Sequence, residues 1–320
     1  MLEAIALSKN DQRYKQNNTK LCEALVSTSK EYADYDVGTG LFPPLRTSGV
    51  KDPPKTVNGM FMTTAIENDP LFSNIPGFQS QNSKVLIGKK ISGYDRAVMD
   101  AVYTLWLRRK DKTVDECSLS YIEIYRTMIG DPKKEVHIDT QRKIARSITK
   151  LRNIDSLLIF DDDMDRVKQY FPAKADSIYV REHLISAMQI GIKLKNGSAT
   201  GGIKLYACPI LHRYAEAQTQ ILTVPMTWIS LPGKISEKKI AIRDYLVRHI
   251  KALSSKKTKI KITKIKYETI IEGAGIPWSD DRRIQCKDRH LVNEILDYYV
   301  NAKIIQKYEK VDSKTIEIVI

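Results

Sequence analysis

One stretch of the chain carries basic and apolar residues on opposite sides at helical spacing. In residues 140–153, Ile148 and Leu151 fall within about 40° of Ile144 on a helical wheel. The opposite arc holds hydrogen-bond donors, namely Arg142, Lys143, Arg146, Thr149 and Lys150. An arginine fork can read guanine in a major groove, while lysine and threonine can hold phosphates. The pattern predicts a DNA-recognition helix, and the alternative is an ordinary helix with a solvated, charged outer face.

A second helix near the C-terminus shows a weaker form of the same pattern. Its apolar stripe is formed by Ile284, Leu291, Ile295 and Tyr298. The far side holds Arg282, Arg289 and Asn293, with Arg283 and His290 flanking them. Acidic residues at positions 288, 294 and 297 dilute the charge of this face. We expect a second DNA reader here, and a dimerisation helix or a purely structural helix is the alternative.

A lysine-rich connector precedes that helix, over residues 256–266. Lys259 and Lys261 share one side of an extended chain with Thr263, which suits contact with phosphates. The alternative is a solvated edge strand whose lysines block aggregation. The two interpretations are compatible.

Signatures of catalysis are weak. The best candidate is the carboxylate run Asp161–Asp165, because clustered carboxylates can hold two Mg²⁺ ions for phosphoryl transfer. An exposed turn whose aspartates cap the next helix explains the same residues. Residues 86–90 lack the glycines of a phosphate-binding loop, and the five histidines and four cysteines form no metal-ligand spacing. We therefore expect a protein that is not an enzyme and has no metal and no cofactor.

Three helices and a β-hairpin are predicted around the first basic helix. Ser92 is expected to cap a helix that runs to Trp106, and a second helix over 119–129 is expected to end at Gly130. Asp139 or Thr140 is expected to cap the basic helix. Strands are expected at 157–160, 177–181, 188–194 and 203–206, of which the last two form a hairpin. This is the order of a winged helix.

The same order recurs after residue 225. Ser236 is expected to cap a first helix, a short second helix covers 267–271, and Asp280 is expected to cap the long third helix. Strands at 304–308 and 315–320 complete a second hairpin. The repeat lies in the order of elements and not in sequence identity. The predicted fold class is therefore α+β, with two winged-helix domains in tandem, each a helix-turn-helix plus a β-hairpin wing, and a poorly structured N-terminal arm.

Charge and composition agree with a polyanionic partner. The 320 residues carry a net charge of +14, but residues 1–89 hold 10 basic against 9 acidic side chains, so nearly all of the excess lies beyond them. No apolar run reaches the roughly 20 residues that span a bilayer. The N-terminus lacks the order of a secretory signal. We expect a cytoplasmic protein without membrane contact, divided into an N-terminal arm or irregular cap (1–89), a first domain (90–225) and a second domain (226–320).

The stretch from Tyr94 to Leu151 contains YDRAVMDAVYTLW, YIEIYRTMIG and TQRKIARSITKLR. It resembles the first winged-helix domain of plasmid and mobile-element replication initiators, and residues 226–320 are similar to their second domain. The resemblance implies binding to origin repeats in double-stranded DNA, recruitment of host replication proteins, and autorepression as a homodimer. It places DNA contacts at Arg142, Lys143, Arg146 and Lys150 in the first domain and at Arg282, Arg289 and Asn293 in the second. The long N-terminal arm and the 160–207 insertion depart from the familiar pattern, which leaves the dimer interface open.

Three classes of function remain open on the sequence. The first is a replication initiator that binds an origin without catalysis. The second is a transcriptional or partition regulator with the same DNA chemistry. The third is a nicking or primase enzyme. Mg²⁺-dependent nicking or primer synthesis would distinguish the third from the first two.

Overall fold

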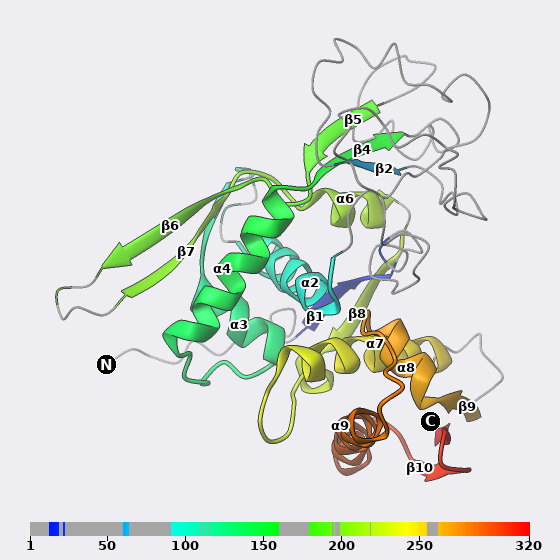
Figure 1. Ribbon diagram of the computed structural model, residues 1–320. Helices are drawn as coiled ribbons and strands as arrows, with labels where there is room; N and C mark the ends of the chain where they lie inside the picture. Colours follow the sequence, from blue (N-terminus) through cyan, green and yellow to red (C-terminus); the bar gives the residue numbers. More distant parts are fainter. Residues whose placement is uncertain are drawn as a thin grey trace.

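The protein has a mixed α+β structure in which small antiparallel sheets pack against helices (Figure 1). The computed structural model describes residues 13–18, 22, 60–63, 91–109, 111, 113–114, 116–159, 179–193, 195, 199–217, 219–254 and 262–320. The Asp161–Asp165 run and the two connector lysines, Lys259 and Lys261, lie outside these residues.

The first repeated unit consists of a helix, a strand, two further helices and a β-hairpin. Its three strands form one antiparallel sheet in the order β3–β7–β6, so β6 lies at an edge. The elements are α2 (Gly93–Leu107), β3 (Cys117–Ser120), α3 (Tyr121–Ile129), α4 (Ile138–Arg152), β6 (Ala187–Lys193) and β7 (Ala199–Leu205). The predicted second helix from residue 119 is thus a short strand followed by a helix.

The second unit repeats this order of elements and of strands. Its sheet has the order β10–β11–β9, in which the strand before the second helix again pairs with the last strand of the hairpin. The elements are α7 (Glu237–Leu253), β9 (Ile262–Lys266), α8 (Tyr267–Gly273), α9 (Arg282–Asn301), β10 (Lys307–Lys310) and β11 (Thr315–Val319). The repeat predicted from element order is therefore present in the topology. Strand β3 was not predicted, whereas β9 corresponds to the edge strand given as the alternative for the connector.

The remaining elements connect or flank the two units. They form a two-stranded sheet of β1 and β8 and a three-stranded sheet in the order β2–β4–β5, together with a short helix. Their bounds are β1 (Arg13–Asn17), β2 (Met60–Thr63), β4 (Asp155–Ile159), β5 (Tyr179–His183), α6 (Ile210–Ala217), β8 (Ile221–Pro225) and the 3₁₀ helix η3 (Met226–Trp228).

Local capping explains where most helices begin and end. Ser92 caps α2 in a capping box with Asp95, and Ser236 caps α7, both as predicted. Gly130 ends α3 with a φ of +68°, in the left-handed region that favours glycine. Two predicted caps were wrong by one or more residues, because α4 begins after His137 and α9 is capped by Asp281.

Strand β1 lies inside the segment predicted as a poorly structured arm. It pairs antiparallel with β8, and the side chains of Tyr14, Gln16 and Asn17 are buried. At residues 13–17 the expected poorly structured arm is therefore an ordered strand, whose polar residues are buried against α2. The rest of residues 1–89 lies almost entirely outside the described residues.

The two units share one hydrophobic core, and they contact each other through α2 of the first unit and α7 of the second. Helix α2 is buried along most of its length, so it has neighbours on every side. A Cβ added at Gly93 would lie 2.7 Å from the Cβ of Ala241 on α7 and 2.3 Å from the carbonyl oxygen of Ala274. Glycine at position 93 therefore permits the close approach of the two units.

Candidate nucleic-acid interface

Helix α4 separates its apolar and basic residues as the sequence predicts. Ile144, Ile148 and Leu151 are fully buried in the core. Arg142, Lys143, Arg146 and Thr149 are exposed, and Lys150 is half-buried. The helix thus presents a continuous outward strip of basic and hydroxyl side chains. Figure 1 shows this helix at one side of the molecule, next to the β6–β7 hairpin.

Acidic partners divide the basic residues of α4 into different classes. Arg142 and Lys143 make exposed ion pairs, with Asp139 at 2.9 Å and with Glu237 at 3.0 Å. Exposed pairs of this kind are weak and can be exchanged for another anion. Arg146 has no acidic partner among the residues that the structure describes, and its Nε lies 3.4 Å from the carbonyl oxygen of Arg142. Arg146 is the basic residue of this strip most available to a ligand.

Lys150 is engaged inside the protein. Its ammonium lies 2.6 Å from Oδ2 of Asp95, whose side chain is only 7% exposed. The same carboxylate accepts hydrogen bonds from the Ser92 and Ser147 hydroxyls at 2.8 and 2.7 Å. The structure therefore places Lys150, predicted to bind DNA, in the packing of α4 on α2.

Gln189 connects the hairpin to α4. From strand β6 its Nε2 donates to the carbonyl oxygen of Ala145 at 2.9 Å and to the Tyr121 hydroxyl at 3.1 Å. Its Oε1 lies 2.9 Å from the hydroxyl of Thr149, which also lies 2.9 Å from the Ala145 carbonyl oxygen. Gln189 fixes the base of the hairpin against the basic strip. It was not predicted, because nothing local marks a glutamine 40 positions from its helix partner.

Helix α9 is rotated relative to the predicted phase. Its core side consists of Val292, Ile295, Leu296 and Tyr299, whereas Ile284, the predicted reference residue, is 40% exposed. With about 100° per residue, the arc opposite this core holds Arg283, Lys287 and His290, all of them exposed.

Two residues predicted on the far side of α9 have partners within the second unit. The Arg289 guanidinium donates to the carbonyl oxygen of Ser313 at 2.6 Å, and thereby ties α9 to the turn of the β10–β11 hairpin. The Asn293 side chain accepts a hydrogen bond from the Tyr267 hydroxyl at 2.7 Å. Arg282 remains exposed beside Arg283 at the start of the helix. The basic side of α9 is therefore centred on its first two turns.

The first turn of α7 contacts both basic helices. Glu237 pairs with Lys143 of α4, and the next two residues turn to α9, where Lys238 pairs with Asp288 and Lys239 with Glu294. Asp288 and Lys239 are buried, whereas their partners Lys238 and Glu294 are about a third exposed, so both pairs lie at the edge of the core. The acidic residues that dilute the charge of α9 in the sequence are thus mostly neutralised by α7.

Strand β9 continues the lysine-rich connector. It forms the edge of the second sheet, and Lys264 and Lys266 are exposed on it. An exposed lysine-bearing edge strand is compatible with either predicted role, blocking aggregation or contacting phosphates. Lys259 and Lys261 themselves lie outside the described residues.

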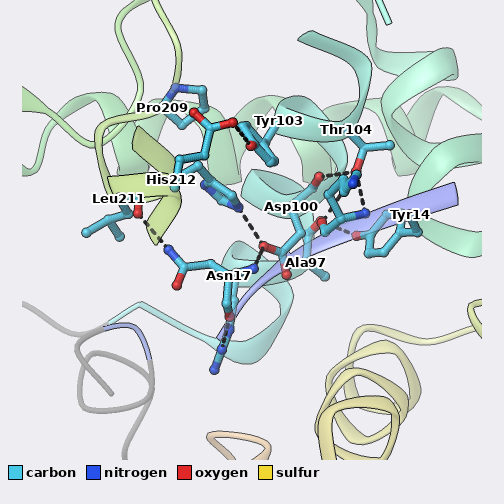
Figure 2. A network of polar contacts seen from close by, with 12 residues as sticks. Tyr14, Asn17, Ala97, Asp100, Tyr103, Thr104, Pro209, Leu211 and His212 are labelled. Carbon is cyan, nitrogen blue, oxygen red and sulfur yellow. Dashed lines mark hydrogen bonds and ion pairs between the residues drawn. The ribbon is translucent and has the colours of Figure 1, made fainter. Parts of the chain in front are cut away.

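A buried polar network anchors β1 and α6 to α2 (Figure 2). Oδ1 of Asp100 lies 2.7 Å from Nε2 of His212 and accepts the backbone N–H of Asn17 at 2.9 Å. The Asn17 amide donates to the carbonyl oxygen of Leu211 at 2.8 Å. Asp100 and His212 are fully buried, so this acid–histidine pair is structural and has no access to a substrate.

Other kinds of site receive no support from the described part of the chain. No group of three histidine, cysteine or acidic side chains within it could hold a metal ion. Burial raises the pKa of the Cys208 thiol, which disfavours a reactive thiolate there. Among the helices that the structure describes, none combines the length and apolar character required to cross a membrane.

Comparison with known proteins finds little similarity. No protein-family model matches the sequence, and no curated protein sequence matches it. A crystal structure of SeMet derivatives of domains 2 and 3 of RctB is similar, with 11% identity and a TM-score of 0.39, over 75% of this chain and 84% of that chain. A second crystal structure of RctB domains 2-3 has 9% identity and a TM-score of 0.35, over 74% of this chain and 83% of that chain. Similarity at this level assigns no family and carries no argument about function.

Proposed function

We propose that the protein binds double-stranded DNA sequence-specifically and that each repeated unit is a winged-helix domain. The observation that carries this proposal is the outward strip of α4, where Arg142, Lys143 and Arg146 are exposed opposite a fully buried apolar stripe. A major groove admits a helix of this kind, and arginine is the side chain that most often reads guanine there. The net charge of +14 supports a polyanionic partner.

In the proposed complex the third helix of each unit lies in a major groove. Arg142 and Arg146 of α4 contact base edges, while Lys143 exchanges Glu237 for a phosphate. The start of α9 provides a second contact through Arg282 and Arg283. We assign the role of the wing, which contacts the adjoining backbone, to the β6–β7 hairpin that Gln189 holds against α4.

The proposed biological role is initiation of replication at the origin of a plasmid or mobile element, by binding and recruitment without catalysis. This part of the proposal rests on the resemblance of residues 94–151 and 226–320 to such initiators. A transcriptional or partition regulator uses the same DNA chemistry and is the second candidate. A nicking or primase enzyme is tested by incubating supercoiled target plasmid with Mg²⁺ and nucleotides. Nicking or primer formation that is lost in an Asp161/Asp163 double-alanine variant would contradict a role in binding alone.

The DNA-binding proposal is tested by selecting a target duplex from random sequences and then measuring the affinity of variants for it. Arg146→Ala should weaken binding by about 1–3 kcal/mol if Arg146 makes a bidentate base contact, and it should relax preference at one base pair. Arg13→Ala is the matched control, because it removes the same charge from an exposed position on β1. Unchanged affinity in both Arg142→Ala and Arg146→Ala would contradict the placement of α4 in the groove.

A further inference from the structure

Asp139 lies beside Arg142, an exposed arginine in the first turns of α4. Its carboxylate accepts a hydrogen bond from Nη1 of Arg142 at 2.9 Å, one helical turn away. Their side chains are 79% and 67% exposed, so this pair lies on the outer surface and not in the core. The helix cap at His137 makes no side-chain hydrogen bond, and the Asp139 carboxylate is turned to Arg142.

The pairing leaves most of the Arg142 guanidinium available. An arginine has five N–H donors in a planar fork, and the contact with Asp139 uses one of them. A contact at one corner biases the direction of the guanidinium without fixing it, so somewhat less conformational entropy is lost when its other donors meet the two acceptors of a guanine edge. The same carboxylate opposes a phosphate that approaches this fork, because like charges repel.

We propose that Asp139 is a specificity-determining residue that orients Arg142 for a base and discourages its use on phosphates. The inference rests on the proposed function, since it concerns the same reading helix. Non-specific binding to DNA comes almost entirely from phosphate contacts, whereas specific binding adds base contacts. Asp139 therefore favours the specific complex and disfavours the non-specific ones.

Glu237 on α7 provides the contrast, because it pairs with the neighbouring basic residue of α4. Its distance to Lys143 is 3.0 Å and both side chains are about half exposed, but a lysine ammonium is a point charge without a fork to orient. Neutralising Glu237 therefore frees Lys143 to contact a phosphate, which strengthens binding to every DNA sequence equally. Neutralising Asp139 removes the same charge and the orientation of Arg142 as well.

The experiment measures the affinity of the full chain for two duplexes over a range of salt concentrations. One duplex is the sequence selected by the wild-type protein, and the other is a shuffled duplex of equal length and base composition. Asp139→Asn should reduce the preference for the selected duplex by about threefold, which corresponds to about 0.7 kcal/mol and lies within the range of an exposed pair. It should also relax the base preference at one position, and Asp139→Glu should restore both. Glu237→Gln should tighten binding to both duplexes by the same factor and leave the preference unchanged.

Two outcomes would contradict the inference about Asp139, and a third would contradict the proposed function. If Asp139→Asn behaves like Glu237→Gln, with equal gains on both duplexes, Asp139 acts only through its charge and the inference is wrong. If Asp139→Asn changes neither affinity nor base preference, the inference is also wrong. If the wild-type protein selects no sequence at all, the proposed function itself fails. Thermal unfolding of each variant separates these effects from a loss of folded protein.

Discussion

Replacing Lys150 by methionine distinguishes a structural lysine from a DNA-binding one. Methionine keeps most of the aliphatic stem and removes the ammonium that lies 2.6 Å from the Asp95 carboxylate. We expect Lys150→Met to destabilise the protein while leaving its affinity for DNA within about twofold of wild type. Arg146→Ala should do the opposite, because Arg146 is exposed and surface substitutions usually change stability by less than about 0.5 kcal/mol.

The size of the loss follows from the surroundings of Asp95. Removing one partner of a buried ion pair costs about 3–5 kcal/mol, whereas an exposed pair contributes at most about 1 kcal/mol. Asp95 is 7% exposed but Lys150 is 37% exposed, and the carboxylate keeps its hydrogen bonds to Ser92 and Ser147 in the variant. An intermediate loss of about 1–2 kcal/mol is therefore expected.

Urea unfolding followed by circular dichroism measures this loss as a lower midpoint at an unchanged slope. The same preparations are then titrated with the selected duplex. The reasoning would be refuted if Lys150→Met unfolded like the wild type and lost as much DNA affinity as Arg146→Ala. That result would mean that Lys150 leaves Asp95 at no cost and binds DNA.

Two further substitutions test the close contact between the two units at Gly93 and the pH dependence of the protein's stability. Gly93→Ala should destabilise the chain by about 1–3 kcal/mol in urea unfolding, because the new Cβ would lie 2.3 Å from the backbone carbonyl oxygen of Ala274, and a wild-type midpoint would contradict this close contact. Burial lowers the pKa of the His249 imidazole, so the unfolded chain binds the proton first and stability should fall as the pH drops below about 6.5. His249→Gln should flatten that fall between pH 7.5 and 5.5, and equal pH profiles for the wild type and His249→Gln would contradict the assignment.

Features set within one helix were predictable from the sequence. The burial of Ile144, Ile148 and Leu151 depends only on their shared stripe and on α4 having a body to pack against. The caps at Ser92 and Ser236 depend on hydroxyls that reach backbone groups three residues away. Such short-range chemistry is readable without knowing the fold.

Features that depend on distant partners were not predictable. Lys150 and Asp95 are 55 positions apart in the chain, so a helical wheel of residues 140–153 could not show that the Lys150 ammonium pairs with this carboxylate. For α9, the predicted phase assumed that Ile284 packs in the core, but its side chain in the first turn is 40% exposed. For β1, the buried residues include Gln16 and Asn17, and a hydrophobic pattern cannot predict the burial of such polar residues.

Strand β1 also imposes an order on the events of synthesis. It is made before its neighbours, because Asp100 follows Asn17 by 83 positions. Thr223 on β8, which accepts a hydrogen bond from Lys15, follows Lys15 by 208 positions. At about 5–20 residues per second, a ribosome needs about 10–40 s to deliver β8 after β1. During that time the strand has neither its sheet partner nor, at first, its helix. Its sequence, RYKQN, contains one large apolar side chain and two cations, which suits a strand that must wait in water without aggregating.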